Sequence, residues 1–164
     1  MESSDDLQKK IAMMKQSFFD EGFLDPTQFQ QLENLQDKEM PNFLKDVFSL
    51  YFMDATRKYA EIEQNLHQES SEKQRKDLNR LILKLKGSAM DIGALKTSNE
   101  VNKMIDFFKE GNMERFVASF EQVKIEDENL RVKMDPYFQL LEQEGSSGEE
   151  ENPESLAVEN RTLK

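Results

Sequence analysis

The chain has 164 residues, enough for one domain with a single hydrophobic core. Its net charge of -11 argues against nucleic-acid binding, which requires clustered lysine and arginine, and the absence of cysteine excludes disulfides and thiolate chemistry. No run approaches the ~18 apolar residues of a membrane span, and the acidic N-terminus does not resemble a signal peptide. We therefore expect an intracellular soluble protein that binds neither nucleic acid nor membrane.

The N-terminal part of the chain has the apolar periodicity of helices. Residues 7–18 carry one apolar stripe, which predicts a first helix. Asp25 and Pro26 are typical of an N-cap followed by proline in the first turn, so a short helix is expected next. A long helix is then predicted to begin at Pro41, with the inward stripe Phe43, Val47, Leu50, Tyr51, Ala55, Tyr59, Ile62 and Leu66.

Two more helices are predicted between Ser71 and Gly111. Ser71 and Gln74 can form a capping box at the start of the first, and Gly93 suits a left-handed cap at its end. The second is closed by Gly111, and its apolar residues are Val101, Met104, Ile105 and Phe108.

The last predicted helix carries the apolar residues Phe116, Val117, Phe120, Val123, Leu130, Met134 and Phe138. Pro136 is expected to kink or divide it, because proline lacks a backbone donor. Asp127 falls on the apolar stripe, which predicts looser packing there. From Gly145 onward the composition shifts to Ser, Gly, Glu, Asn and Pro, so residues 145–164 are predicted to form a disordered acidic tail.

These elements together predict an all-α fold without repeats or strands. Four consecutive amphipathic helices with short connections are most simply an antiparallel four-helix bundle, and two shorter N-terminal helices would cover one end. The helical domain is expected to span residues 1–144, followed by the tail over residues 145–164.

The helix over residues 78–92 has the most informative outer face. Its inward stripe is Leu78, Ile82, Leu85, Ala89 and Ile92. Leu83 points roughly 140° away from the centre of that stripe, and Gly87 lies one turn further along the same outer face. The charged residues beside them are Arg80, Lys84 and Asp91.

Gly87 needs an explanation, because glycine inside a helix costs about 1 kcal/mol relative to alanine. One explanation is that Gly87 lets a neighbouring helix pack closely, while Leu83 is a single exposed leucine of the kind common on protein surfaces. The other is that Gly87 leaves room for a partner that docks around Leu83. Helical periodicity alone does not decide between these explanations.

Three segments resemble plant histidine-containing phosphotransfer proteins in order and spacing. They are residues 21–37, 41–54 and 85–94, with a weaker similarity at residues 122–124 and 140–143. The resemblance covers roughly residues 5–144, and its most specific parts are Lys86-Gly87-Ser88 and Ile92-Gly93-Ala94. The family carries His-x-Leu-Lys-Gly-Ser, and Leu83 fills the place of its histidine.

The resemblance implies a docking surface without its nucleophile. In this family the histidine accepts a phosphoryl group from a receiver-domain aspartate and later passes it on, while the receiver supplies acidic residues and Mg²⁺. By resemblance, Lys86 would help with phosphoryl charge and Gly87 would give room for docking, whereas Ala89 and Met90 replace the family's usual serines. The receiver-binding residues implied are Arg80, Leu83, Lys84, Lys86, Gly87, Ser88 and Asp91.

No other residue in the sequence supplies the missing chemistry. The only histidine, His67, lies 16 positions before Leu83 and is expected to be exposed at a helix end. There is no EF-hand spacing, Glu-x-x-His pair, phosphate-binding glycine loop or supported Ser–His–Asp arrangement. We therefore expect no metal, no cofactor and no catalytic residue.

These observations lead us to interpret the chain as a pseudo-histidine phosphotransfer protein that is not an enzyme. It would bind receiver domains of hybrid sensor kinases and response regulators and inhibit the phosphorelay by competition, by resemblance in cytokinin or related two-component signalling. We expect a monomer in the cytoplasm and nucleus. Two alternatives stay open: an active phosphotransfer protein that uses another acceptor such as His67, and a helical scaffold without receiver contacts.

Overall fold

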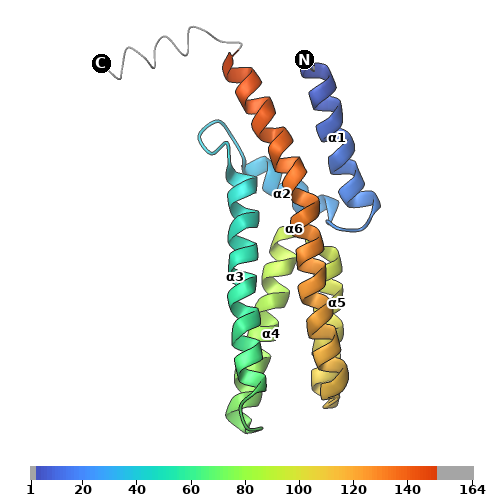
Figure 1. Ribbon diagram of the computed structural model, residues 1–164, viewed down its shortest axis with the longest axis vertical. Coiled ribbons are helices and arrows are strands. Elements are labelled where there is room, and N and C mark those ends of the chain that lie inside the picture. The colour runs from blue at the N-terminus through green and yellow to red at the C-terminus, as the bar shows by residue number, and fades with distance from the viewer. Residues whose placement is uncertain (1–2, 151–164) are drawn as a thin grey trace, which may run out of the picture. The chain divides into compact units, whose positions relative to one another are not determined.

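The computed structural model describes residues 3–150, with side chains described for residues 3–145. Over this range the chain forms six helices and one isolated β-bridge. The helices are α1 (Ser4–Asp20), α2 (Pro26–Leu35), α3 (Phe43–Leu66), α4 (Glu72–Ile92), α5 (Leu95–Glu110) and α6 (Met113–Glu150) (Figure 1). The predicted all-α class is confirmed. None of the described helices is long and apolar enough to cross a membrane.

The described residues divide into two compact units, residues 3–18 with 132–150 and residues 19–131. In the first unit, the buried rings of Phe18 and Tyr137 pack edge to face with 5.2 Å between their centroids. Tyr137 also contacts the ring of Phe138, at 6.1 Å. This aromatic group accounts for the inward position of Phe18 at the end of the predicted stripe on α1.

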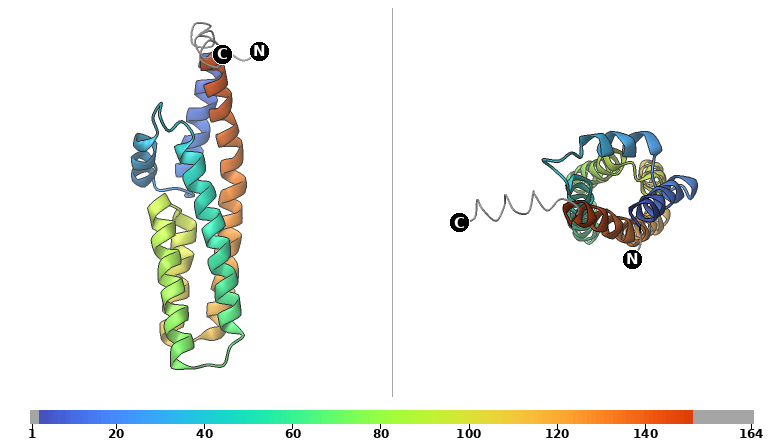
Figure 2. Two further views of the ribbon diagram at one scale, coloured as in Figure 1. Left: turned by 90° about the vertical axis from the view of Figure 1, so that its left-hand side faces the viewer. Right: turned by 90° about the horizontal axis from the view of Figure 1, so that it is seen from above.

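Helices α3, α4, α5 and α6 share the hydrophobic core of the second unit. Its buried residues are Ala55, Tyr59, Ile62, Leu78, Leu81, Ile82, Leu85, Val101, Met104, Phe108, Phe116, Phe120 and Val123. Helix α4 packs against both α3 and α5, and the two views of Figure 2 show these helices alongside one another. The inner face of α4 is therefore covered on both flanks.

The ends of α4 are set by the capping residues that the sequence predicts. The Ser71 hydroxyl accepts a 3.1 Å hydrogen bond from the backbone N–H of Gln74. The Gln74 side chain does not complete a capping box; it donates to the Asn65 carbonyl in the last turns of α3, at 3.2 Å. At the other end Gly93 has a φ of 75°, which favours glycine over every other residue.

The C-terminal end of α4 is also held by the segment that precedes α2. The backbone N–H of Asp25 donates to the Gly93 carbonyl at 2.8 Å, and Leu95 donates to the Phe23 carbonyl at 3.1 Å. A Cβ atom at Gly93 would lie 3.2 Å from the Cβ atom of Gln28, so only glycine fits without displacement. These contacts fix the position at which α4 ends.

The predicted starts of α2 and α3 have different outcomes. Helix α2 begins at Pro26, and the Asp25 carboxylate caps it by accepting a 3.1 Å hydrogen bond from the Thr27 N–H, as predicted. Helix α3 begins at Phe43, not at Pro41, which lies in the preceding turn. The fixed φ of proline suits a turn as well as the first turn of a helix, so the sequence does not distinguish the two.

Two residues that are predicted to face inward are exposed. Leu50 on α3 is 62% exposed and Val117 on α6 is 41% exposed. Each one is next to a residue that does face the core, Tyr51 and Phe116 respectively. Successive residues on a helix point about 100° apart, and here the core covers Tyr51 and Phe116 but not the residues next to them.

Helix α6 is one element from Met113 to Glu150, with Pro136 inside it. Of the predicted kink or division at Pro136, the division is therefore wrong, and the helix continues beyond residue 144, where the tail is predicted to begin. Proline has no backbone N–H, so the carbonyl of Val132, four residues earlier, receives no hydrogen bond from position 136. Pro136 and Val132 are both exposed, so water can solvate that carbonyl. Residues 151–164, the rest of the predicted tail, lie outside the described residues.

Asp127 is tightly held, which corrects the looser packing predicted around it. Its side chain is buried and accepts hydrogen bonds from the hydroxyls of Tyr51 (2.7 Å), Tyr59 and Thr97 (2.8 Å). Burial raises the pKa of Asp127 above its usual value, and the three hydrogen bonds oppose this increase only in part. Burial, together with the charge of Asp127, also raises the pKa values of Tyr51 and Tyr59, so both phenols stay protonated as donors. The cluster ties α6 to α3 and α5.

Candidate docking surface on α4

The core stripe of α4 determines which side chains face outward. All five predicted stripe residues are buried: Leu78, Ile82, Leu85, Ala89 and Ile92. Leu83 is 50% exposed, on the side of α4 that faces away from this buried stripe. The predicted outward position of Leu83 is confirmed.

Gly87 lies in open surroundings on the same outer face. A Cβ atom at this position would have no atom within 4 Å. No neighbouring helix therefore makes use of the missing side chain, and the close-packing explanation for Gly87 is wrong. The surface one turn beyond Leu83 is left free for a partner.

Ser88 is turned toward α3 and is not open on the outer face. The Lys58 amine on α3 donates to the Ser88 hydroxyl at 3.1 Å and also contacts the Asp54 carboxylate at 2.5 Å. The Lys58 side chain is only 13% exposed, whereas its partner Asp54 is 53% exposed. Ser88 thus joins α3 to α4, and its predicted role in partner contact stays a prediction.

The charged residues predicted for the surface remain accessible to different degrees. Arg80 and Lys84 are exposed, and Lys86 is half-buried. Arg80 has a distant ion pair with Asp77 (3.9 Å), whereas neither Lys84 nor Lys86 has an ion-pair partner among the described residues. Asp91 is exposed, and its carbonyl is held by the Gln28 side chain at 2.7 Å. Two lysine amines are therefore available to an acidic partner.

The charge of α4 contrasts with that of the chain. The helix carries six basic and three acidic residues, while the net charge of the whole chain is -11. A basic helix in an otherwise acidic chain gives its own exposed face a more positive potential than the rest of the chain.

A groove beside this face contains residues that the sequence does not single out. It has a volume of about 460 Å³ and lies between α3 and α4, next to Ser88 and Asp91. Its α3 wall includes Leu50 and Met53, which are 62% and 51% exposed. The sequence analysis missed this wall because it assigned Leu50 to the inward stripe of α3.

His67 does not approach Leu83. It is exposed at the C-terminal cap of α3, as predicted, and its backbone N–H bonds to carbonyls of the last turn. Leu83 lies roughly 16 Å along α4 from the start of that helix. Among the described residues no three His, Asp or Glu side chains come together in a way that could hold a metal ion.

Sequence comparisons find relatives over nearly the whole chain. Pseudo histidine-containing phosphotransfer protein 5 of rice is 41% identical over 90% of this chain and 95% of its own length. Pseudo histidine-containing phosphotransfer protein 2 of rice is 38% identical, with 94% and 96% covered. Histidine-containing phosphotransfer protein 4 of Arabidopsis thaliana is 39% identical over 73% of this chain and 91% of its own length. No family model matches the chain.

Structural comparisons point to the same family. A histidine-containing phosphotransfer protein from Medicago truncatula superposes with a TM-score of 0.77 at 26% identity, covering 88% of this chain and 96% of that one. A maize counterpart gives 0.73 at 28% identity, covering 84% and 98%. The helical fold and these relatives thus place the chain in the histidine phosphotransfer class of proteins of two-component signalling. The chain belongs to the histidine-containing phosphotransfer family, with pseudo members from rice among its relatives.

Proposed function

We propose that this protein docks on receiver domains of sensor histidine kinases and response regulators through the outer face of α4, without accepting a phosphoryl group. The observation that carries the proposal is an exposed Leu83 at the centre of an otherwise open docking face. Bound in this way, the protein would act as a competitive inhibitor of the phosphorelay.

The fold expected of the family underlies this proposal. We infer that α3 to α6 form its antiparallel four-helix bundle, with α1 and α2 as additional N-terminal helices. The core shared by α3, α4, α5 and α6 supports this arrangement. Such a bundle presents α4 as a rigid surface, and rigid elements hold a binding face more precisely than loops do.

The electrostatics of α4 favour an acidic partner. Receiver domains carry acidic residues around their phosphorylation site. The amines of Lys84 and Lys86, which have no ion-pair partner among the described residues, flank Leu83, and α4 is basic within an acidic chain. Charge complementarity of this kind increases the rate of encounter and selects the partner.

The absence of phosphoryl acceptance is inferred from the side chains near position 83. Leucine has no nucleophilic atom, and the Ser88 hydroxyl is already engaged by Lys58. His67 lies at the end of α3, outside the face. A partner that docks here would meet no imidazole to accept a phosphoryl group.

The effect of Leu83 on affinity is expected to be small. Burial of a leucine side chain contributes roughly 1.5–3 kcal/mol. Leu83 would, however, face the carboxylates and the metal ion of the receiver, and their desolvation opposes binding by a similar amount of roughly 1–3 kcal/mol. We therefore expect an affinity close to that of an active family member.

The family resemblance also suggests the oligomeric state, the pathway and the cellular compartments of the protein. We propose that the protein acts as a monomer, in cytokinin or a related plant two-component pathway, in the cytoplasm and nucleus. Several active members and receivers would share these compartments, and a decoy there would lower phosphorelay flux in proportion to its concentration.

The test is a competition assay. Phosphoryl transfer from a labelled plant receiver to an active family member is followed while this protein is added, with Mg²⁺ present. We expect the initial rate to fall as the added protein saturates the receiver, while the protein itself stays unlabelled. A Gly87→Trp variant, which fills the open face, should not inhibit. An unchanged rate at saturating protein would refute the proposal, and acid-labile label on the protein would favour active transfer through another acceptor.

A further inference from the structure

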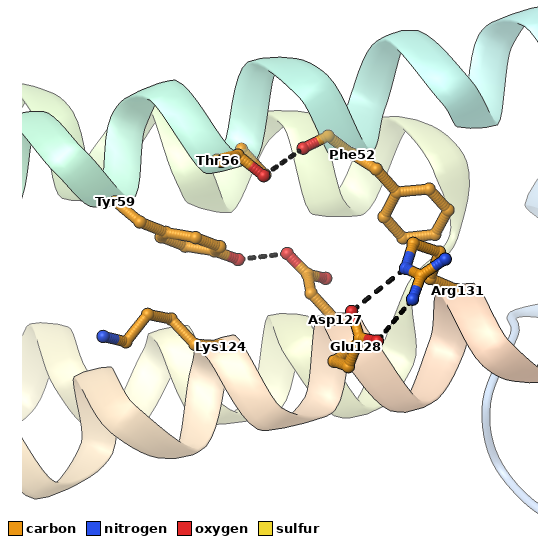
Figure 3. A pocket seen from close by; sticks show the side chains of 8 residues that line it. Phe52, Thr56, Tyr59, Lys124, Asp127, Glu128 and Arg131 are labelled. Atoms are coloured by element: carbon orange, nitrogen blue, oxygen red, sulfur yellow. Dashed lines mark hydrogen bonds and ion pairs between the residues drawn. The ribbon is translucent and has the colours of Figure 1, made fainter.

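A second hollow lies in the same unit, between α3 and α6 (Figure 3). Its volume is about 250 Å³, and it shares no lining residue with the groove beside Ser88. Phe52 and Tyr59 come from α3, and the buried Asp127 comes from α6. The docking function proposed above makes no use of this pocket.

The Asp127 carboxylate has a hydrogen-bond acceptor position that the neighbouring hydroxyl groups do not occupy. One carboxylate oxygen accepts from Tyr51 and Thr97, and the other accepts from Tyr59 alone. A carboxylate oxygen can accept two hydrogen bonds. The oxygen bound to Tyr59 therefore keeps one acceptor position, on a side chain that is only 4% exposed.

The charged groups at the rim leave the pocket with an excess of negative charge. Lys124 is held by Glu63 at 2.7 Å and by Glu121 at 3.0 Å. Arg131 is paired with Glu128 through two hydrogen bonds, of 3.0 and 2.5 Å. Both basic side chains are thus paired with acidic ones, and Asp127 is left as the charged lining residue for which the described residues supply no basic partner. A cation is favoured here over an anion.

The walls supply apolar and aromatic surface. The rings of Phe52 and Tyr59 and the methyl group of Ala55 line the pocket. Figure 3 shows the Tyr59 hydroxyl and the Asp127 carboxylate meeting at one side of the space, with Phe52 at another. Aromatic faces attract cations that lie over them. The volume is below the ~300–1,000 Å³ of drug-sized sites, which limits the ligand to a small molecule.

We propose that this pocket is a binding site for a small aromatic or planar organic cation, one N–H group of which donates to Asp127. The cation completes the hydrogen bonding of the carboxylate, and its apolar body contacts Phe52 and Tyr59. The site is independent of receiver docking, so either proposal can fail without the other.

Benzamidine, benzamide and benzoate form a matched set of probes for this site. They have the same shape and about nine heavy atoms, and they differ in charge. A ligand of that size reaches a dissociation constant of about 1 mM at ordinary ligand efficiency. Titration of the isotope-labelled full chain, followed by two-dimensional NMR, should show saturable benzamidine shifts at Phe52, Tyr59 and Asp127, weaker benzamide shifts and no benzoate binding.

Three variants complete the test. Asp127→Asn keeps the shape and removes the charge, and Thr56→Phe blocks the mouth of the pocket from an exposed position that leaves Asp127 intact. Ser49→Phe, also exposed on α3 but outside the pocket, is the control. We expect benzamidine affinity to fall at least about tenfold in the first two variants and to be unchanged in the control.

Some outcomes would overturn the proposal. Equal binding of benzamidine and benzamide would remove the role assigned to charge. Shifts spread over the acidic surface, or unchanged binding by the folded Thr56→Phe variant, would place the cation elsewhere. No saturable binding at several times the expected dissociation constant would leave the pocket to water alone.

Discussion

The Lys58 amine on α3 donates a 3.1 Å hydrogen bond to the Ser88 hydroxyl on α4. The same amine contacts Asp54 at 2.5 Å, and the Lys58 side chain is nearly covered. This bridge ties the two helices together beside the face around Leu83. It assigns Ser88, which belongs to the Lys86-Gly87-Ser88 motif, a supporting contact between α3 and α4.

Replacement of Ser88 by alanine tests that assignment. Lys58 keeps its pairing with Asp54, so the free energy of unfolding should fall by about 0.5–1.5 kcal/mol, the contribution of one hydrogen bond. Receiver affinity should stay within about twofold of the wild type. Urea unfolding and titration calorimetry measure the two effects. A large loss of affinity at unchanged stability would place Ser88 in the contact surface instead.

The two glycines of the α4 region should respond to alanine in opposite directions. Gly87→Ala should stabilise the protein by about 1 kcal/mol, because the added methyl group has open space and helix propensity improves. Gly93→Ala should destabilise it by more than about 1 kcal/mol, because φ is 75° there and the methyl group would meet Gln28. Chemical unfolding of both variants checks this. Destabilisation by Gly87→Ala would show that this position packs against another helix.

Charge reversal at Lys84 and Lys86 should slow receiver association. These amines have no ion-pair partner among the described residues, so their replacement by glutamate removes attraction to an acidic partner without breaking an internal contact. We expect the association rate constant to fall by about tenfold or more at low salt, with a smaller effect at high salt. Stopped-flow binding at two ionic strengths measures it. Lys109→Glu, on the exposed side of α5, is the control, and equal rates for all variants would favour the scaffold alternative.

The buried Asp127 should make stability depend on pH in an unusual direction. Burial raises its pKa in the folded state, so folding favours the protonated carboxyl. Its contribution is fully present below the unfolded pKa and is lost as pH rises through the folded pKa. The stability of wild type relative to Asp127→Asn should therefore decrease from about pH 4 to pH 7. Urea unfolding of both proteins over this range measures the difference, and an increase would show that the hydroxyl donors outweigh burial.

The sequence predicts most of α4 and much less of what surrounds it. The 4-3-4-3 spacing of Leu78, Ile82, Leu85, Ala89 and Ile92 places one face against the core, and Leu83 outside it follows from helical geometry. Local signals also predict the caps at Ser71 and Gly93. These features depend on residues that lie a few positions apart, so the sequence of this one helix is enough to predict them.

Features that depend on residues far apart in the chain could not be predicted in this way. Asp127 accepts hydrogen bonds from the hydroxyls of residues that lie 76, 68 and 30 positions away in the sequence. The stripe pattern alone predicted loose packing around it. The Lys58–Ser88 bridge spans 30 positions. The inward positions predicted for Leu50 and Val117 were wrong for a related reason. Each lies next to a second apolar residue in the sequence, and only the tertiary packing decides which of the two is covered.

The most direct test of the central claim compares the wild type with its Leu83→His variant. Affinity for a plant receiver domain and transfer of label from the phosphorylated receiver are measured in the same samples, with Mg²⁺ present. We predict micromolar binding by both proteins and acid-labile label on the variant alone. Binding by neither protein would contradict the docking role, and label on the wild type would contradict the loss of phosphotransfer.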